Sequence, residues 1–286
     1  MNGIIIKGIG GFYYVKAAND CIYECKARGR FRKDGVTPII GDNVEIEVNG
    51  KKGSITQISE RKNALVRPAV ANIDTLVIIA AAASPEPNMT LLDKLTVSAL
   101  SNGIEPVICV NKTDLADGDY VADAYRQAGF KTFMISAENG EGVDALVPIL
   151  KDKVTAFAGL SGVGKSTLLN RITGVDLKTG DVSEKIQRGR HTTRHVELFE
   201  LADGGFVLDT PGFSSFELYG IKADELWEYF PEMADTAGEC RFRGCSHISE
   251  PDCAVKAKLE AGEIAKSRYD SYVELYNTLK EIKDWE

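Results

Sequence analysis

The sequence predicts a multidomain protein: an N-terminal OB-like β-barrel, a central α/β domain, and a C-terminal, mostly helical module with a metal-binding pattern. Three observations predict this fold class. Short β-like runs fill residues 1–66, strand and helix patterns alternate over 67–214, and a Cys/His cluster lies among helical patterns in 215–286. Because each pattern is typical of a different layer architecture, we expect three domains with these boundaries.

The bulk composition is that of a globular protein. The chain has 286 residues, 44% of them hydrophobic and 27% charged, with a formal net charge of −8. No apolar run approaches the roughly 20 residues that span a bilayer, and the first eleven residues lack a cleavage-site pattern. We therefore expect a cytoplasmic protein with no membrane or DNA partner, and we expect a monomer.

The N-terminal segment contains five short β-like runs punctuated by Gly, Asn and Asp, as in a small barrel. The runs are 4–7, 11–16, 21–27, 43–48 and 52–58. Residues 1–66 carry eleven Lys/Arg against seven Asp/Glu, a net charge of +4 on a chain that is acidic elsewhere. Such a basic module fits docking to an RNA surface, with residues 28–34 as a basic loop. A solvated basic surface without a partner explains the charge equally well.

The central segment alternates strand and helix. Residues 75–83 form a continuous apolar run, as expected for a strand buried on both faces. The following elements are predicted as helix 91–101, strand 105–110, helix 120–128, strand 131–135, helix 143–150, strand 154–158, helix 165–172 and the strand pair 195–201 and 205–208. The order indicates a doubly wound α/β domain. Beyond it, helices are predicted at 224–229 and around 269–282, where apolar residues recur every three or four positions.

A phosphate-binding motif, G-x-x-x-x-G-K-S, covers Gly159–Ser166 and lies between a predicted strand and a predicted helix. Backbone N–H groups and the helix N-terminus favour phosphate there. We expect Lys165 to reach the β- and γ-phosphates as a catalytic residue, and the Ser166 hydroxyl to bind Mg²⁺. The expected nucleotide contacts are Gly159, Ser161, Gly162, Val163, Gly164, Lys165, Ser166 and Thr167. The alternative is a glycine turn before a helix.

A guanine-reading motif, Asn111-Lys112-Thr113-Asp114, ends another predicted strand. The Asp114 carboxylate can accept both the N1–H and the N2 amine of guanine, a donor pair that adenine lacks. Asn111 would brace the loop, and the Lys112 stem would cover the base. Ser136 and Ala137, after the next strand, fit the loop that backs the base.

Two segments suit the nucleotide switches. Asp209-Thr210-Pro211-Gly212 follows a strand, so that Asp209 would hold Mg²⁺ through water and the Gly212 N–H would sense the γ-phosphate. The basic segment 189–194 lies between this motif and the phosphate loop. Either Thr192 or Thr193 is expected to close on Mg²⁺ and nucleotide, and we favour Thr193. The alternative is a basic exposed loop.

Four metal-ligating side chains cluster near the C-terminus: Cys240, Cys245, His247 and Cys253. Three thiolates and one imidazole suit a closed tetrahedral Zn²⁺ site of the structural type. Free thiols and an iron–sulfur cluster are the alternatives, although the cluster usually takes four Cys. The other cysteines, Cys21, Cys25 and Cys109, are expected to be buried or free thiols. Trp227 and Phe230 are expected in a core.

The motifs run base clamp, base loop, phosphate loop, switch, D-x-x-G, which is a circular permutation of the usual GTPase order. With the string G-R-H-T-T at 189–193, the chain resembles the ribosome small-subunit-dependent GTPase A family (RsgA, also YjeQ/YloQ) over essentially its whole length. The resemblance implies a circularly permuted GTPase domain, a GTP hydrolase binding GTP/GDP, Mg²⁺ and one structural Zn²⁺. It implies the 30S subunit and 16S rRNA as partners. The basic N-terminal extension of some members is not expected here.

Phe213 follows Gly212, where many GTPases keep a water-orienting Gln. A phenyl ring cannot orient water, and the resemblance implies an enzyme that is slow alone and stimulated by the ribosome. His191 is then the candidate for positioning water in catalysis. Contact with rRNA, or plain solvent exposure, is the rival interpretation of this histidine.

Two other function classes compete with this interpretation. A metabolic P-loop enzyme, such as a nucleotide kinase, would leave the motifs at Asn111–Asp114 and Ser136–Glu138 unexplained. A passive RNA-binding scaffold would hold nucleotide without turnover. Hydrolysis of GTP and of ATP, with and without 30S subunits, distinguishes all three.

Overall fold

The computed structural model describes residues 1–29, 31, 35–66, 68–174, 196–209, 218 and 220–281. The chain divides into two compact units, each assembled from separated segments. One consists of Met1–Thr75, Val147–Phe157 and Leu169–Phe213, and the other of Leu76–Leu146, Ala158–Leu168 and Ser214–Glu286. This division cuts the chain differently from the expected domains 1–66, 67–214 and 215–286, which remain a proposal. No helix in the described ranges is long and apolar enough to cross a membrane.

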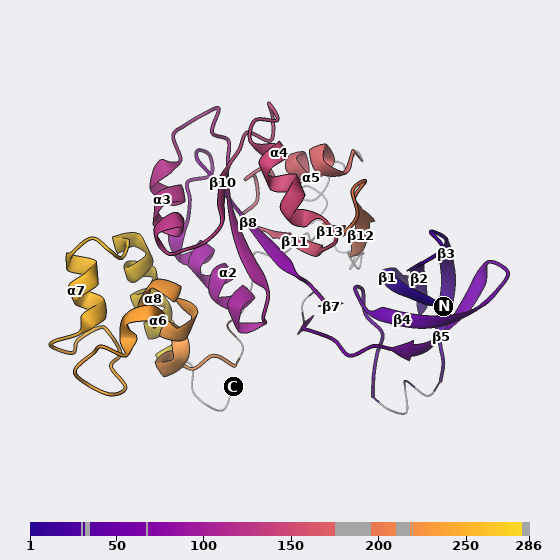
Figure 1. Ribbon diagram of the computed structural model, residues 1–286, viewed down its shortest axis with the longest axis horizontal. Coiled ribbons are helices and arrows are strands. Elements are labelled where there is room, and N and C mark those ends of the chain that lie inside the picture. Colours follow the sequence, from indigo (N-terminus) through magenta and orange to yellow (C-terminus); the bar gives the residue numbers. More distant parts are fainter. Residues whose placement is uncertain are drawn as a thin grey trace, which may run out of the picture. The chain divides into compact units, whose positions relative to one another are not determined.

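A closed five-stranded barrel forms the N-terminal part of the first unit (Figure 1). Its strands are β1 (Asn2–Ile9), β2 (Phe12–Ala17), β3 (Ile22–Ala27), β4 (Asn43–Asn49) and β5 (Lys52–Ile58). Antiparallel β1–β2–β3 continues through a parallel β3–β5 pair to β4, and β4 returns to β1. Alternate side chains, such as Ile5, Val15 and Ile55, fill the interior. The OB-like barrel predicted from the sequence is therefore confirmed.

The rest of the first unit supplies the strand that leads into the phosphate loop. β11 (Val154–Ala158) pairs in parallel with β13 (Phe206–Asp209), and β12 (Glu197–Glu200) pairs antiparallel with β13. A short hairpin of β6 (Ala64–Leu65) and β7 (Val70–Ala71) follows the barrel.

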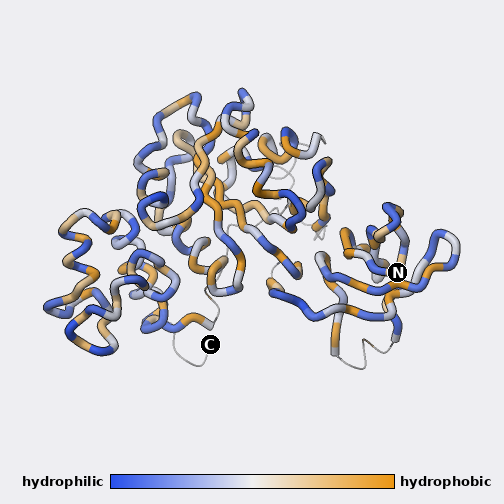
Figure 2. Tube along the Cα trace, viewed as in Figure 1, coloured by the Kyte–Doolittle hydropathy of each residue, from blue (hydrophilic) through white to orange (hydrophobic). Residues whose placement is uncertain are grey.

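The second unit contains the strands that carry the base clamp. They are β8 (Thr75–Ala81), β9 (Glu105–Asn111) and β10 (Thr132–Met134), neighbours in that order. Every residue of β8 is buried, as its continuous apolar sequence predicts (Figure 2). The accompanying helices are α2 (Met89–Ser101), α3 (Asp119–Gln127) and α4 (Val143–Leu146). After the phosphate loop comes α5 (Lys165–Thr173), of which only the residues up to Leu168 belong to this unit.

One predicted helix, 143–150, is shorter than expected. The α-helix ends at Leu146, and residues Val147–Leu150 form the 3₁₀ helix η1. Pro148 has no backbone N–H and its ring clashes with the carbonyl four residues before it, so that the α-helix cannot continue through it.

The C-terminal module belongs to the second unit and is mostly helical. It contains η3 (Ala223–Tyr229), α6 (Pro231–Ala237), α7 (Ala254–Glu260) and α8 (Lys266–Glu281). Its core includes Phe230, Met233 and Tyr272, and also Val97 of α2. Phe230 is buried, as expected, and Trp227 packs at the margin of this core. Because α2 contributes an apolar side chain to this core, the C-terminal module and α2 share one hydrophobic interior.

Candidate functional site: a nucleotide loop and a cysteine–histidine centre

The phosphate loop connects β11 to α5, the strand–loop–helix context that its sequence predicts. Gly159 has φ 145° and Gly164 has φ 95°, in the left-handed region that favours glycine. A Cβ on Gly159 would lie 2.3 Å from the Ile79 carbonyl oxygen, so this position excludes any larger residue. A Cβ on Gly164 would likewise lie 2.3 Å from the Asn111 Nδ2, so the fold itself requires both glycines.

Lys165 opens α5, and its ammonium group lies back over the loop. The Nζ donates to the carbonyl oxygens of Gly159 and Leu160, at 2.6 and 2.7 Å. Ser166 and Thr167 follow in the first helical turn and are half-buried. A positive side chain and a helix N-terminus thus converge on one small loop, an arrangement that favours a phosphate group.

Asn111, at the end of β9, joins the base clamp to the phosphate loop. Its Nδ2 donates to the Val163 carbonyl oxygen at 2.8 Å, and its Oδ1 accepts from the Ala137 N–H at 2.9 Å. The side chain is buried, with 2% of its surface exposed. One amide therefore joins the base clamp, the base loop and the phosphate loop, which the sequence predicts to meet around a nucleotide.

The other clamp residues differ in their exposure. Lys112 has φ 65°, and its Nζ donates to the Ser84 carbonyl oxygen. Asp114 is exposed, as a carboxylate that receives a base requires. Ser136 is buried and its Oγ accepts from the Asn139 N–H at 3.1 Å, which stabilises the base loop. The assignment of these residues to guanine stays a prediction.

The switch residues lie mostly outside the described part of the chain. His191, Thr192, Thr193 and Gly212 are not within it. Asp209 is the last residue of β13, one position inside a strand that was predicted to end at residue 208, and its side chain is not among those described. The predicted roles of these residues in catalysis and in Mg²⁺ binding therefore stay predictions.

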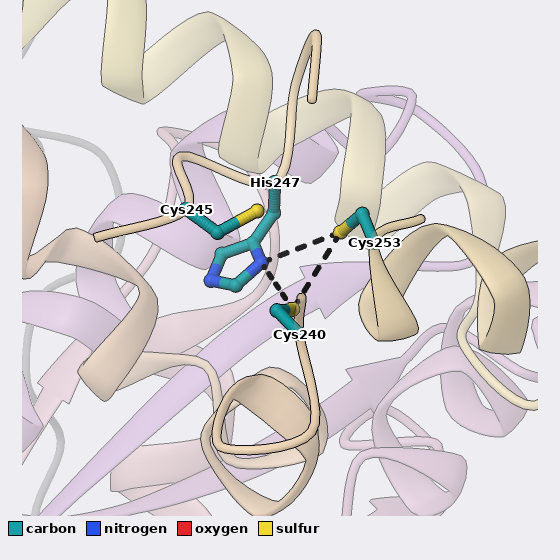
Figure 3. A group of neighbouring side chains, drawn as sticks. All are labelled: Cys240, Cys245, His247 and Cys253. Atoms are coloured by element: carbon teal, nitrogen blue, oxygen red, sulfur yellow. Dashed lines mark hydrogen bonds between the residues drawn. The ribbon is translucent and has the colours of Figure 1, made fainter. Parts of the chain in front are cut away.

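The four predicted zinc ligands do come together (Figure 3). One ligand atom from each of Cys240, Cys245, His247 and Cys253 lies within 4.8 Å of all the others. The His247 Nδ1 is 3.5 Å from the sulfurs of Cys240 and Cys253, which are 3.9 Å apart. A tetrahedral zinc with bonds of about 2.0–2.3 Å spaces its N and S ligands by about 3.5–3.8 Å. The four residues fit a closed zinc site.

Burial shapes the chemistry of this centre. It lowers the pKa of His247, which keeps the imidazole neutral and able to bind a metal. It also raises the pKa of the Cys245 thiol to about 12. A divalent cation would reverse this preference by stabilising the thiolate, so metal loading is expected to release protons.

Two residues outside the predicted ligand set support the ligand loop. The Glu250 carboxylate accepts from the Ser246 and Ile248 N–H groups at 2.9 and 3.2 Å. Burial alone would raise its pKa, but these donors hold the pKa at about 2. The Trp227 ring meets the His247 imidazole edge-on, with centroids 5.9 Å apart. The apolar pattern places Trp227 in a core, and only its nearness to the ligands in the sequence marks Glu250 beforehand.

Fold and site together define a P-loop protein whose guanine-clamp motif precedes its phosphate loop. Comparison with known families agrees: the RsgA GTPase family matches residues 58–219, and the RsgA N-terminal domain matches residues 2–55. The chain therefore belongs to the RsgA GTPase family, and it is a GTP hydrolase.

Similar proteins cover nearly the whole chain. A small ribosomal subunit biogenesis GTPase RsgA of Ruminiclostridium cellulolyticum is 50% identical, over 99% of this chain and 95% of its own length. The corresponding protein of Bacillus pumilus is 45% identical, over 99% and 97%. The crystal structure of YloQ, a circularly permuted GTPase, has TM-score 0.83 and 39% identity over 100% and 96%. YjeQ from Thermotoga maritima has TM-score 0.84 and 34% identity over 99% of each chain.

Proposed function

We propose that this chain assists assembly of the small ribosomal subunit by hydrolysing GTP to GDP and phosphate while bound to the 30S particle. The observation that carries the proposal is the Asn111 amide, which bonds the base-clamp loop to the phosphate loop at Val163. This bond makes the two motifs parts of one site, as a guanine nucleotide spanning base and phosphates requires. The names of the relatives supply the ribosomal setting.

Each residue of the site has a proposed role that follows from its motif. Lys165 neutralises charge on the transferred phosphoryl group, and the loop backbone fixes the β-phosphate. Asp114 selects guanine by accepting its two N–H donors, with Lys112 covering the ring. Mg²⁺, when bound, would balance the phosphate charge, held by Ser166, Asp209 and Thr193 as the sequence predicts. His191 is the proposed water-positioning residue.

We place the Zn²⁺ in a structural role. The segment that carries the ligands joins helices of only seven residues each, so four strong metal bonds add stability where local structure is short. The barrel, with its +4 charge over residues 1–66, is the proposed docking surface for 16S rRNA. A cytoplasmic monomer fits this assignment.

The decisive experiment compares hydrolysis of GTP and ATP by purified protein, with and without 30S subunits. We expect turnover of GTP only, accelerated by the particle. Equal use of ATP would indicate a metabolic P-loop enzyme. Guanine binding without turnover under any condition would indicate a passive scaffold.

A second measurement tests whether the bound nucleotide changes the affinity of the protein for 30S subunits. The switch segments are expected to be ordered by the triphosphate and released on hydrolysis. Affinity for 30S subunits should therefore differ between GDP and a non-hydrolysable GTP analogue. Equal affinities would contradict a nucleotide-driven cycle.

A further inference from the structure

A buried arginine lies at the centre of the second unit. Arg268, in the first turn of α8, has none of its surface exposed. Its Nε and Nη2 donate to the two carboxylate oxygens of Glu232 in α6, at 2.7 and 3.0 Å. Its Nη1 donates to Asp93 of α2, whose side chain is equally buried. A single guanidinium thus ties α8 to α6 and α2.

Aromatic rings enclose this ion cluster. The guanidinium carbon of Arg268 lies 4.8–5.0 Å from the ring centroids of Tyr125, Phe130 and Phe230. The Tyr125 hydroxyl donates to Asp93 at 2.7 Å. Since a buried charge is costly without its partners, the geometry of the arginine is tightly determined.

The first two turns of α8 also hold the ligand loop of the metal centre. The Tyr269 hydroxyl donates to the carbonyl oxygen of His247, and the Tyr272 hydroxyl donates to that of Ser246, both at 2.7 Å. The position of a ligand residue and the position of Arg268 are therefore fixed by one helical segment.

Just before Asp93, at its N-terminus, α2 adjoins the nucleotide loops. Its N-cap, Asn88, follows a segment in which the Ser84 carbonyl receives the Lys112 ammonium. The next residues, 85–88, line a small cavity together with Leu160 and Val163 of the phosphate loop. Contacts that hold α2 in place therefore also hold the segment before it. That segment lies beside the phosphate loop and accepts the Lys112 side chain of the base clamp.

We propose that Arg268 is a positioning residue through which metal loading and guanine-nucleotide binding stabilise each other. Metal in the Cys/His centre orders the His247 loop and, through Tyr269, the first turn of α8. Through its bond to Asp93, Arg268 in turn holds α2 in place, and α2 holds the loops that receive nucleotide. Sites that order the same elements bind cooperatively, and the effect is reciprocal. The inference rests on the proposed function, since it needs a guanine nucleotide.

Zinc affinity of the full-length protein, measured by competition with a chromogenic chelator, tests the proposal with and without saturating GDP. Wild-type protein should bind zinc more tightly with GDP, within the roughly 5–150-fold range of such couplings. A fluorescent GDP analogue should show the same factor when zinc is removed. Arg268→Met should bring both factors to about one. Lys266→Met, which removes an exposed ion pair with Asp270 in the same turn, is the matched control and should keep them.

Arg268→Met leaves two buried carboxylates unpaired, so a second variant guards against misfolding. The neutral triple variant, Arg268→Met with Asp93→Asn and Glu232→Gln, removes the whole ion cluster. It should also lose the coupling while still binding zinc. Retained coupling in this variant, or equal wild-type zinc affinities with and without GDP, would overturn the inference. Wild-type protein that binds no guanine nucleotide would overturn the proposed function as well, which separates the two failures.

Discussion

The Asn111 side chain donates to the carbonyl oxygen of Val163 at 2.8 Å across 52 residues of sequence. A base-reading motif and a phosphate-binding motif, inverted in their order along the chain, are thereby joined by one buried hydrogen bond. The Oδ1 atom of the same amide accepts a hydrogen bond from the Ala137 N–H. The permutation has changed where the chain begins and ends relative to these loops without separating them.

Replacing Asn111 by Ala should weaken nucleotide binding. The Val163 carbonyl and the Ala137 N–H would lose their partner, and each unmet buried group costs about 1–3 kcal/mol. We expect the affinity for a fluorescent GDP analogue to fall about 10–100-fold. Asn139→Ala, an exposed residue of the same base loop, is the control. Equal affinities of the two variants would show that this bond does not support the site.

Asp114→Asn should change the preferred base. The carboxylate accepts two N–H donors of guanine, whereas an amide offers one donor and one acceptor, which suits the carbonyl at position 2 of xanthine. GTP hydrolysis should fall at least about 100-fold, and XTP hydrolysis should rise. The measurement is kcat/KM for GTP, XTP and ATP. A variant that still prefers GTP would place base recognition elsewhere.

Removing the metal should loosen the C-terminal module. Protein purified without chelator should contain about one zinc per chain, and Cys245→Ser should lose it. Because Trp227 packs on His247, its fluorescence should change on metal removal, and the thermal midpoint should fall. Cys21→Ser, an exposed thiol outside the cluster, is the control. Native zinc-free protein with three reactive C-terminal thiols would contradict the assignment.

Cys109 should make stability depend on alkaline pH. Burial in β9 raises the pKa of its thiol to about 12, from an ordinary value near 9. Below pH 9 both folded and unfolded chains keep the proton, so stability is full. As pH rises toward 12, only the unfolded chain ionises, and the free energy of unfolding falls by at most about 1.4 kcal/mol per pH unit.

Urea unfolding at pH 8 and pH 10.5 tests this thiol against a Cys109→Ala variant. Between these two conditions the wild-type protein should lose about 2 kcal/mol more than the variant. Parallel losses in the two proteins would mean that other groups account for the alkaline dependence.

Local patterns predicted most of the elements because their signals are local. The five barrel runs and the apolar run of β8 match the observed strands within a few residues. The phosphate loop and the Cys/His set were likewise predictable, because fixed ligand chemistry imposes fixed spacing. Helices α6 and α7 were not predicted. Each has seven residues, too few to display a 3.6-residue period clearly.

Contacts between residues far apart in the sequence could not be predicted, for a different reason. Nothing local to Asp93 or Arg268 indicates that they meet across 175 residues, and both residue types are usually exposed. A Glu such as Glu250, which gathers four loop donors, looks like any surface acid in the sequence. These contacts depend on tertiary placement, and a pattern of neighbours carries no information about it.

The shared interior of α2 and the C-terminal module limits how this protein can be shortened for study. A fragment ending at Gly220 would retain the nucleotide motifs and yet leave Asp93 without its cation and Val97 facing water. Such a fragment should aggregate or lose activity for reasons unrelated to zinc. Full-length variants with single substitutions are therefore the sounder means of dissecting the C-terminal module.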